Sequence, residues 1–271
     1  MNVAHMVMLL VIASAAFAGR DASLSTVLTP DGRIMEGASG SFDPEGFRMT
    51  YGPDGEPLFV AEASLSGEPA PFSGGQYGAG TWYTLGSGVN DEVRAVAVSG
   101  SDVYVGGEFT EAGGSPASRV AKWDGSSWHP LGSGVNGVVH AIAVSGSDVY
   151  VGGNFNQAGG SPANNIARWD GSSWHPLGSG VGGGGTYLGV YALAVSGSDV
   201  YVGGYFIEAG GSPANYIARW DGSSWHPLGS GVNDWVRSID ISDTGIVYVG
   251  GTFTQAGSSH ANNIARWDGS S

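Results

Sequence analysis

The chain has 271 residues, 49 glycines and no cysteine, and its 10 basic against 24 acidic side chains give a formal net charge of −14. This length suits one large all-β domain or two small ones. The lack of cysteine excludes disulfides, thiolate nucleophiles and zinc sites built on cysteine. The negative charge repels phosphate backbones, so we expect no nucleic-acid partner.

Residues 1–18 have the pattern of an export signal. An apolar run over residues 6–12 is followed by small residues and the sequence Ala16-Phe17-Ala18, which predicts cleavage before Gly19. The apolar run is far shorter than the roughly 20 residues that span a bilayer as a helix. We therefore expect a secreted or cell-surface protein with no membrane span after the signal is removed.

Residues 19–81 are rich in proline and acidic residues and lack the repeat that fills the rest of the chain. Residues 24–35 and 47–60 each place a Pro-Asp-Gly turn between β-prone residues, which predicts two hairpins. Residues 61–80 are interpreted as a linker. We therefore expect a small β-hairpin segment and linker over residues 19–81, ahead of the repeat region.

Residues 82–271 are built from tandem repeats. The sequence Ser-Asp-Val-Tyr-Val-Gly-Gly begins at Ser101, Ser147 and Ser198, and a looser copy ends at Gly251. Equivalent tryptophans at positions 123, 169, 220 and 267 are separated by 46, 51 and 47 residues. A period of this size is typical of a propeller or solenoid array.

Each repeat contains four strand candidates separated by turn residues. In the first copy they span residues 93–98, 102–109, 119–123 and 128–131. Small alanines occur on the first strand and tryptophans on the third and fourth, as expected when sheets converge on an axis. These features predict an all-β fold, a β-propeller of about four four-stranded blades.

The sequence also suggests how the propeller closes. Residues 81–90 match residues 127–136, which include the fourth strand of a repeat, and the last repeat lacks that strand. We therefore expect residues 82–85 to pair with residues 264–267 and to close a four-bladed ring. The alternative is an open arc that belongs to a larger propeller.

The motif of Val-Tyr-Val-Gly-Gly, a loop, an aromatic residue before Asp-Gly and a following Trp resembles the kelch repeat of galactose-oxidase-type propellers. The repeats are more similar still to glycine-rich tandem repeats of secreted bacterial proteins. They depart from kelch in having Trp where kelch has Tyr, and in an Ala-Gly-Gly-Ser-Pro-Ala insert. The copper radical chemistry that this resemblance would allow needs a cysteine cross-linked to tyrosine, so no cofactor is expected.

The histidines and loops indicate neither a metal site nor a known catalytic motif. His129, His175 and His226 occupy the same position on separate repeats, where their side chains would point away from one another, so we expect no metal site. The sequence contains neither a Gly-x-Ser-x-Gly elbow nor a phosphate-binding loop. The glycine run over residues 182–185 is interpreted as a flexible insertion.

The repeats differ from one another at a few positions that should share one face of the propeller. Variation between copies on a constant scaffold is typical of a binding face, although drift on a solvated surface is the alternative. The predicted ligand-binding residues, for a carbohydrate or protein ligand, are Arg94, His140, Tyr191, Tyr205, Trp235 and Arg237.

We therefore predict a non-enzymatic propeller with a binding, structural or adhesive role and no catalytic residues. The alternative is a hydrolase or lyase that acts on polysaccharide and uses Asp91, Glu92 and Asp234 near the channel mouth. Glycoside cleavage requires two carboxyl groups facing each other at roughly 5 to 10 Å. Their geometry decides between the two hypotheses.

Overall fold

The computed structural model describes residues 22–23, 42–43, 47–51, 57–61 and 82–269. The chain divides into two units, residues 1–82 and 83–271. The expected signal at residues 1–18, the hairpin at residues 24–35 and residues 62–80 of the expected linker lie outside the described residues.

Two pairs of short strands are described in the first unit. Strands β1 (Ala22–Ser23) and β2 (Phe42–Asp43) are parallel. Strands β3 (Phe47–Tyr51) and β4 (Pro57–Ala61) are antiparallel, with Tyr51 opposite Pro57. This is the pairing expected of the second hairpin, whose turn lies outside the described residues.

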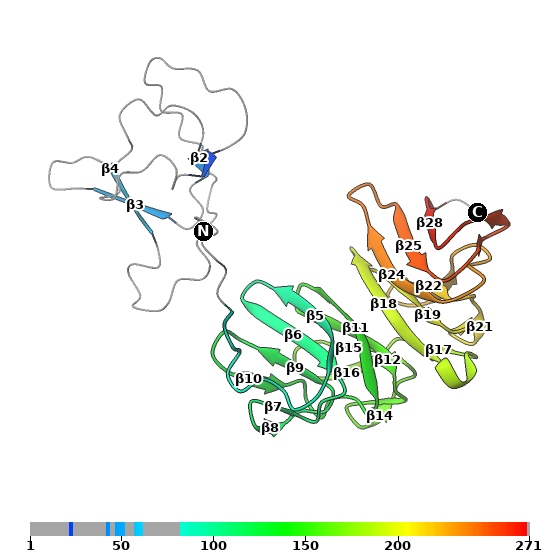
Figure 1. The fold of residues 1–271 in the computed structure, drawn as a ribbon, viewed down its shortest axis with the longest axis horizontal. Helices are drawn as coiled ribbons and strands as arrows, with labels where there is room; N and C mark the ends of the chain where they lie inside the picture. The colour runs from blue at the N-terminus through cyan, green and yellow to red at the C-terminus, as the bar shows by residue number, and fades with distance from the viewer. Residues whose placement is uncertain (1–21, 24–41, 44–46, 52–56, 62–81, 270–271) are drawn as a thin grey trace, which may run out of the picture. The chain divides into compact units, whose positions relative to one another are not determined.

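The second unit contains four antiparallel sheets, here called blades 1 to 4, that follow one another in chain order (Figure 1). Blades 1 to 3 have four strands each and blade 4 has three. The structure thus confirms the predicted all-β propeller fold. The strands are β5 (Val93–Ser99), β6 (Asp102–Gly107), β9 (Val120–Trp123) and β10 (Trp128–Pro130) in blade 1; β11 (Val138–Ser145), β12 (Asp148–Asn154), β15 (Ile166–Trp169) and β16 (Trp174–Pro176) in blade 2; β18 (Gly189–Ser196), β19 (Asp199–Tyr205), β22 (Ile217–Trp220) and β23 (Trp225–Pro227) in blade 3; and β24 (Val236–Ile241), β25 (Val247–Gly251) and β28 (Ile264–Trp267) in blade 4.

Short hairpins between the second and third strands form from the Ala-Gly-Gly-Ser-Pro-Ala insert in blades 1 to 3 and from Ala-Gly-Ser-Ser-His-Ala in blade 4. The segment that follows each fourth strand pairs with the hairpin of the next blade, as Val135 does with Ala158, and so ties neighbouring blades together. These hairpins are β7 (Glu111–Ala112) with β8 (Ser115–Pro116), β13 (Gln157–Ala158) with β14 (Ser161–Pro162), β20 (Glu208–Ala209) with β21 (Ser212–Pro213), and β26 (Gln255–Ala256) with β27 (Ser259–His260).

The Gly-Gly doublet of each repeat makes close packing possible in two directions. A Cβ at Gly152 would overlap the side chain of Val190 in the next blade, and a Cβ at Gly153 would overlap the carbonyl of Val138 in its own first strand. Only glycine allows both approaches. The doublet therefore fixes how one blade rests on the next.

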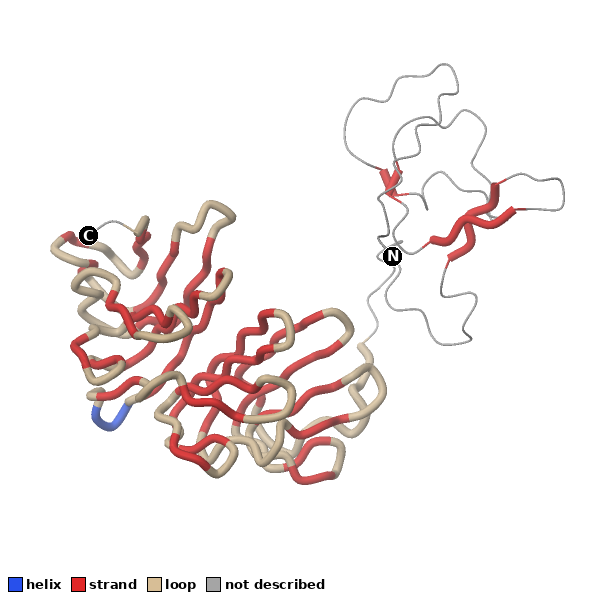
Figure 2. The backbone as a smooth tube through the Cα atoms, turned by 180° about the vertical axis from the view of Figure 1, so that it is seen from behind, coloured by secondary structure: helices blue, strands red, loops and turns tan. Residues whose placement is uncertain are grey.

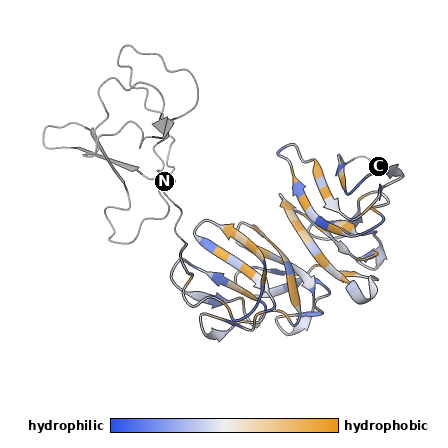
Figure 3. Ribbon diagram, in the orientation of Figure 1, coloured by the Kyte–Doolittle hydropathy of each residue, from blue (hydrophilic) through white to orange (hydrophobic). Residues whose placement is uncertain are grey.

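Apolar residues, which run along the strands of each blade (Figure 3), form the core between two neighbouring blades, so blades 2 and 3 are covered on both faces. Between blades 2 and 3, for example, Tyr150 and Ile166 pack in one cluster with Val190 and Val200. The first strands of neighbouring blades lie side by side (Figure 2). Their small alanines fit this close approach, as the sequence predicted.

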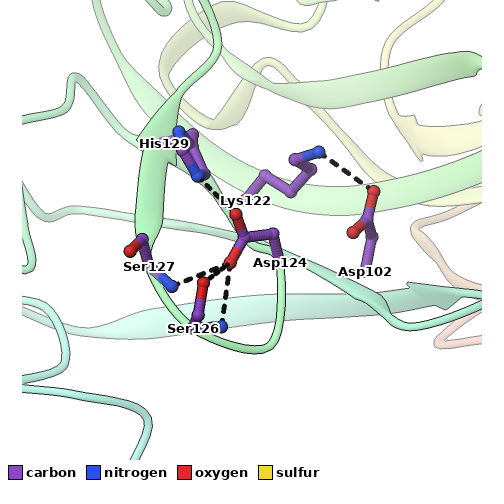
Figure 4. A network of polar contacts seen from close by, with 6 residues as sticks. All are labelled: Asp102, Lys122, Asp124, Ser126, Ser127 and His129. Atoms are coloured by element: carbon purple, nitrogen blue, oxygen red, sulfur yellow. Dashed lines mark hydrogen bonds and ion pairs between the residues drawn. The ribbon is translucent and has the colours of Figure 1, made fainter. Parts of the chain in front are cut away.

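The turn between the third and fourth strands is held by its aspartate (Figure 4). Oδ1 of Asp124 accepts hydrogen bonds from the backbone N–H groups of Ser126 and Ser127, each at 2.8 Å, and Oδ2 lies 2.7 Å from Nε2 of His129. The equivalent bonds recur in blades 2 and 3. The aspartates and histidines of the repeat thus serve a local structural purpose in these three blades.

The predicted closure by residues 82–85 is not found in this structure. Strand β28 pairs with β25 alone among the described residues, and Tyr83 and Leu85 lie outside any strand. Leu85 instead accepts a hydrogen bond through its carbonyl from the indole of Trp128 in blade 1. The array of four blades is therefore open, and blade 4 does not reach blade 1 (Figure 1).

The insertion in the third repeat adopts defined structure. Its first residues form strand β17 (Val181–Gly182), which pairs with β20, and the 3-10 helix η3 (Gly185–Tyr187) follows.

No helix within the described ranges is long and apolar enough to cross a membrane.

Candidate binding face

Four of the six predicted ligand-binding residues occupy a β-bulge in the first strand of their blade. In blade 2, Val139 lies opposite Gly153 and Ala141 lies opposite Gly152, so that His140 is the extra residue. The same register shift places Arg94, Tyr191 and Arg237 in the bulges of the other blades. A bulge turns a side chain away from the regular alternation of a strand, and bulges are frequent beside functional sites.

The bulge residues of blades 2 to 4 meet across the array. The rings of His140 and Tyr191 are stacked, with centroids 4.5 Å apart and planes 16° from parallel. The ring centroids of Tyr191 and Trp235 lie 5.3 Å apart, and the Arg237 guanidinium carbon lies 4.6 Å from the centroid of Trp235. These side chains form a continuous row that ends in a cation resting on an indole.

Further aromatic residues complete a surface around Trp235, here called the aromatic cluster and consisting of Tyr187, Tyr191, Tyr205, Tyr216 and Trp235. The centroid of the Tyr205 ring lies 4.9 Å from that of Trp235 and 5.5 Å from that of Tyr216. Tyr187 lies 5.4 Å from Trp235, and its carbonyl accepts a hydrogen bond from the Tyr191 hydroxyl at 3.3 Å. Tyr187 is exposed and the other four side chains are half-buried, so the rings are fixed and still accessible.

Arg94 occupies the equivalent bulge of blade 1, where it is held by two carboxylates. Its guanidinium donates to Glu92 at 2.9 Å and to Glu108 at 2.6 Å. Burial lowers the pKa of His140 to about 4, with the positive charge of Arg94 adding to this effect and Glu108 opposing it. His140 is therefore neutral at pH 7 and can stack on Tyr191 without a charge to hydrate.

A polar cavity of about 660 Å³ lies between blades 2 and 3, and Leu188, which follows Tyr187 of the aromatic cluster, contributes to its wall. Asparagine side chains dominate its wall, and the insertion of the third repeat contributes Gly182 and Leu188. Since Tyr187 precedes Leu188, this insertion contributes both to the cavity and to the aromatic cluster. The asparagines that line the cavity are Asn136, Asn154, Asn156, Asn164 and Asn165.

The structure thus brings together His140, Tyr191, Tyr205, Trp235 and Arg237, and the charge of Arg94 acts on His140. Sequence reasoning missed two members of the aromatic cluster. Tyr187 lies in the insertion that lengthens the third repeat, and Tyr216 occupies a position that also varies between copies. The same criterion of variation between repeats could have found both.

The carboxylates of the enzymatic alternative have local bonding partners. Oδ1 of Asp91 accepts from the backbone N–H of Glu92, and Oδ1 of Asp234 accepts from that of Trp235. Asp91 precedes the first strand of blade 1 and Asp234 that of blade 4, so they lie on the two end blades of the open array.

The described residues include no group of three or more His, Asp or Glu side chains arranged to hold a metal ion.

Comparison with protein families finds one match within the repeat region. The sequence model of a β-propeller domain of unknown function, DUF5122, matches residues 148–169. These residues extend from β12 to the end of β15 in blade 2. A comparison with curated proteins gives no match.

Several solved structures match part of this chain. The computationally designed protein Ika8 has a TM-score of 0.42 and 19% identity over 65% of this chain and 45% of its own. The designed protein Ika4 has a TM-score of 0.45 and 17% identity over 69% of this chain and 98% of its own. The extracellular domain of a hybrid two-component system from B. thetaiotaomicron has a TM-score of 0.45 and 12% identity over 67% and 21% of the two chains. This chain spans less than half the length of Ika8.

Proposed function

We propose that this protein is a carbohydrate-binding β-propeller that acts outside the cell and binds a neutral oligosaccharide on the aromatic cluster. The observation that carries the proposal is the set of fixed, accessible rings around Trp235 beside a cavity lined by asparagines. The C–H faces of a sugar ring pack on aromatic rings, while its hydroxyl groups exchange hydrogen bonds with side-chain amides.

Charge narrows the class of ligand. The formal net charge of −14 disfavours the approach of polyanionic sugars. At the cluster itself, Arg237 lies over the indole of Trp235 and offers hydrogen-bond donors at its edge. A neutral sugar can accept hydrogen bonds from these donors and is not repelled by the negative net charge of the protein.

Binding is favoured over polysaccharide cleavage because Asp91 and Asp234 accept from the next backbone N–H and lie on separate end blades, and because Glu92 is paired with Arg94. A protein ligand would use the same rings, and it becomes the alternative if no sugar binds. The kelch-type classification of the repeats is part of this proposal and rests on the Val-Tyr-Val-Gly-Gly motif and the spaced tryptophans.

A glycan array with neutral oligosaccharides tests the ligand class. We expect the full-length chain to bind a subset of these glycans and Tyr191→Ala to lose most of that signal, because Tyr191 lies between His140 and Trp235. His260→Ala, which changes an exposed ring in hairpin β27, is the matched control. No binding on the whole panel, or equal binding by Tyr191→Ala, would contradict the proposal.

Export is tested separately by mass spectrometry of the protein recovered from the culture medium. We expect the secreted chain to begin at Gly19, because Ala16-Phe17-Ala18 supplies the small residues that signal peptidase requires. Exported material that retains Met1 would show that this segment is not a cleaved signal.

A further inference from the structure

The first blade exposes an apolar face. The equivalent faces of the other blades are each covered by the preceding blade. Val96 and Val98 on β5 are 60% and 65% exposed. Their counterparts in blades 2 and 3 pack into the cores with the preceding blade, as Ile142 and Val144 do. We call the outer surface formed by Val93, Val96 and Val98 the leading face.

The last blade presents the complementary face. Ile264 on β28 is 67% exposed, whereas its counterparts Ile166 and Ile217 are 0% and 2% exposed because the next blade covers them. Gly250 corresponds to Gly152, which receives Val190 of the next blade, but a Cβ at Gly250 would meet chiefly the hydroxyl of Ser238 in its own blade. We call the surface formed by Tyr248, Gly250 and Ile264 the trailing face.

An empty cavity of about 350 Å³ lies beside β28, between blade 4 and the last loop of blade 3, and is lined by Leu228, Gly229 and Gly257 among others. In blade 3 the indole of Trp225 fills the equivalent space, where it touches Gly210 and donates to the carbonyl of Leu177. Blades 1 and 2 use Trp128 and Trp174 in the same way. We call this cavity of blade 4 the tryptophan slot.

The chain carries a fourth copy of the segment that fills such slots. Trp82 corresponds to Trp128 in the repeat, and its side chain is 99% exposed. The residues after it already lie on blade 1: the Leu85 carbonyl accepts from Trp128, and Val89 pairs with Ala112. This segment therefore lies on blade 1 as the end of a preceding blade would.

We propose that two copies of this chain assemble head to tail, the leading face of each covering the trailing face of the other. Trp82 of one copy then enters the tryptophan slot of the other, and residues 82–84 add a fourth strand to β28. An interface between two different faces closes into a ring when the rotation permits. Two copies of four blades give eight, which is within the usual range for propellers, whereas three copies would exceed it.

Two polar residues on the trailing face set the strength of this contact. Ser238 and Asp240 replace alanines that occupy the same positions in blades 1 to 3, as Ala141 and Ala143 do in blade 2. The Asp240 carboxylate would lose part of its hydration at the interface. Replacing it with alanine is therefore expected to tighten the assembly.

Disulfide trapping tests the geometry, since the chain has no cysteine of its own. His129 lies opposite Lys122 in blade 1, and the equivalent pair across the proposed interface is Tyr83 and Arg266. We expect a mixture of Tyr83→Cys and Arg266→Cys chains to form a disulfide-linked dimer on mild oxidation. Tyr83→Cys mixed with Ser161→Cys, an exposed position in blade 2, is the control.

Two outcomes of trapping would overturn the proposal. The first is equal cross-linking in the control mixture, which would indicate random collision. The second is a chain carrying both Tyr83→Cys and Arg266→Cys that closes on itself as a monomer, which would instead restore the four-bladed ring.

Sedimentation velocity measures the strength of the assembly. We expect the full-length chain to form dimers, Trp82→Ala to raise the dissociation constant at least about tenfold, and Asp240→Ala to lower it. Both side chains are exposed in the single chain, so neither substitution should disturb folding. A monomeric wild-type chain, or dimers that Trp82→Ala leaves unchanged, would overturn the proposal.

Discussion

Each repeat places one residue other than glycine in the left-handed region, with φ between 64° and 67°, just before its third strand. This backbone conformation costs most L-residues about 1 to 2 kcal/mol, and asparagine tolerates it best. The four residues are Arg119, Asn165, Tyr216 and Asn263. Tyr216 belongs to the aromatic cluster, so the least tolerant residue type occurs where the proposed ligand binds.

Asn165 and Asn263 form a matched pair, because they share this backbone conformation and differ in burial. Asn165 is buried and its amide donates to the carbonyl of Val181, whereas Asn263 is exposed. We expect Asn165→Ala to lower the free energy of unfolding by about 2 to 3 kcal/mol and Asn263→Ala by only about 1 kcal/mol. Urea denaturation measures both. Equal losses would mean that the buried hydrogen bond contributes nothing.

The turn aspartates make stability depend on acid pH. Hydrogen bonds from the Ser172 and Ser173 backbone, and then from His175, hold the pKa of Asp170 well below its usual range, and similar bonds lower the pKa of Asp124 and Asp221. Because the folded state favours the carboxylate, this stability is complete above the usual aspartate pKa of about 3.9 and is lost as the pH falls below it.

Thermal denaturation between pH 7 and pH 2 measures this effect. We expect the melting temperature of the wild-type chain to fall more steeply below about pH 4 than that of Asp170→Asn, which keeps an acceptor oxygen but cannot titrate. Asp243→Asn, in an exposed turn of blade 4, serves as the control. Parallel curves for the wild type and Asp170→Asn would refute the account of this turn.

The blade is the element that the repeat specifies most completely. Runs of small apolar residues, Asp-Gly turns and the Gly-Gly doublet predicted all four strands of blade 1 to within two residues, because each signal acts over a few neighbours. The β-bulge at His140 could not be predicted, since nothing in the local pattern marks an extra residue. The stacking of His140 on Tyr191 depends on this bulge and therefore required the structure.

The glycine doublet offers a direct test of blade packing. A Cβ at Gly152 would collide with Val190, so we expect Gly152→Ala to lower the free energy of unfolding by about 1 to 3 kcal/mol. Val190→Ala in the same chain should recover part of this loss, because it removes the colliding methyl groups. Gly250→Ala, which meets chiefly the rotatable hydroxyl of Ser238, should change stability far less. Equal effects at Gly152 and Gly250 would refute this account of the doublet.

At the scale of the whole molecule, the number of blades was predictable and their closure was not. Counting repeats gives four blades, and the copy at residues 82–85 indicates which strand is missing from the last one. Whether a chain completes its own ring depends on the angle between packed blades, which many small side chains determine together. The exposed Val98 and Ile264 are the visible consequence of the open array.

The site shows the same division between local pattern and assembled geometry. Variation between copies identified Tyr191, Tyr205 and Trp235. In the structure the ring centroids of Tyr191 and Tyr205 lie 5.3 Å and 4.9 Å from that of Trp235. Variation alone could not separate a binding face from a drifting surface. The contact of these rings and the neighbouring asparagine cavity favour the binding face.

The most direct measurement of the central proposal is isothermal titration of a glycan selected on the array into four chains: the wild type, Trp235→Phe, Trp235→Ala and the control His260→Ala. We expect affinity to fall slightly in Trp235→Phe and by at least about tenfold in Trp235→Ala, because the indole contacts Tyr187, Tyr191 and Tyr205 at the centre of the cluster. His260→Ala should bind as the wild type does. Unchanged affinity in Trp235→Ala, with the fold intact by circular dichroism, would contradict a binding site on the aromatic cluster.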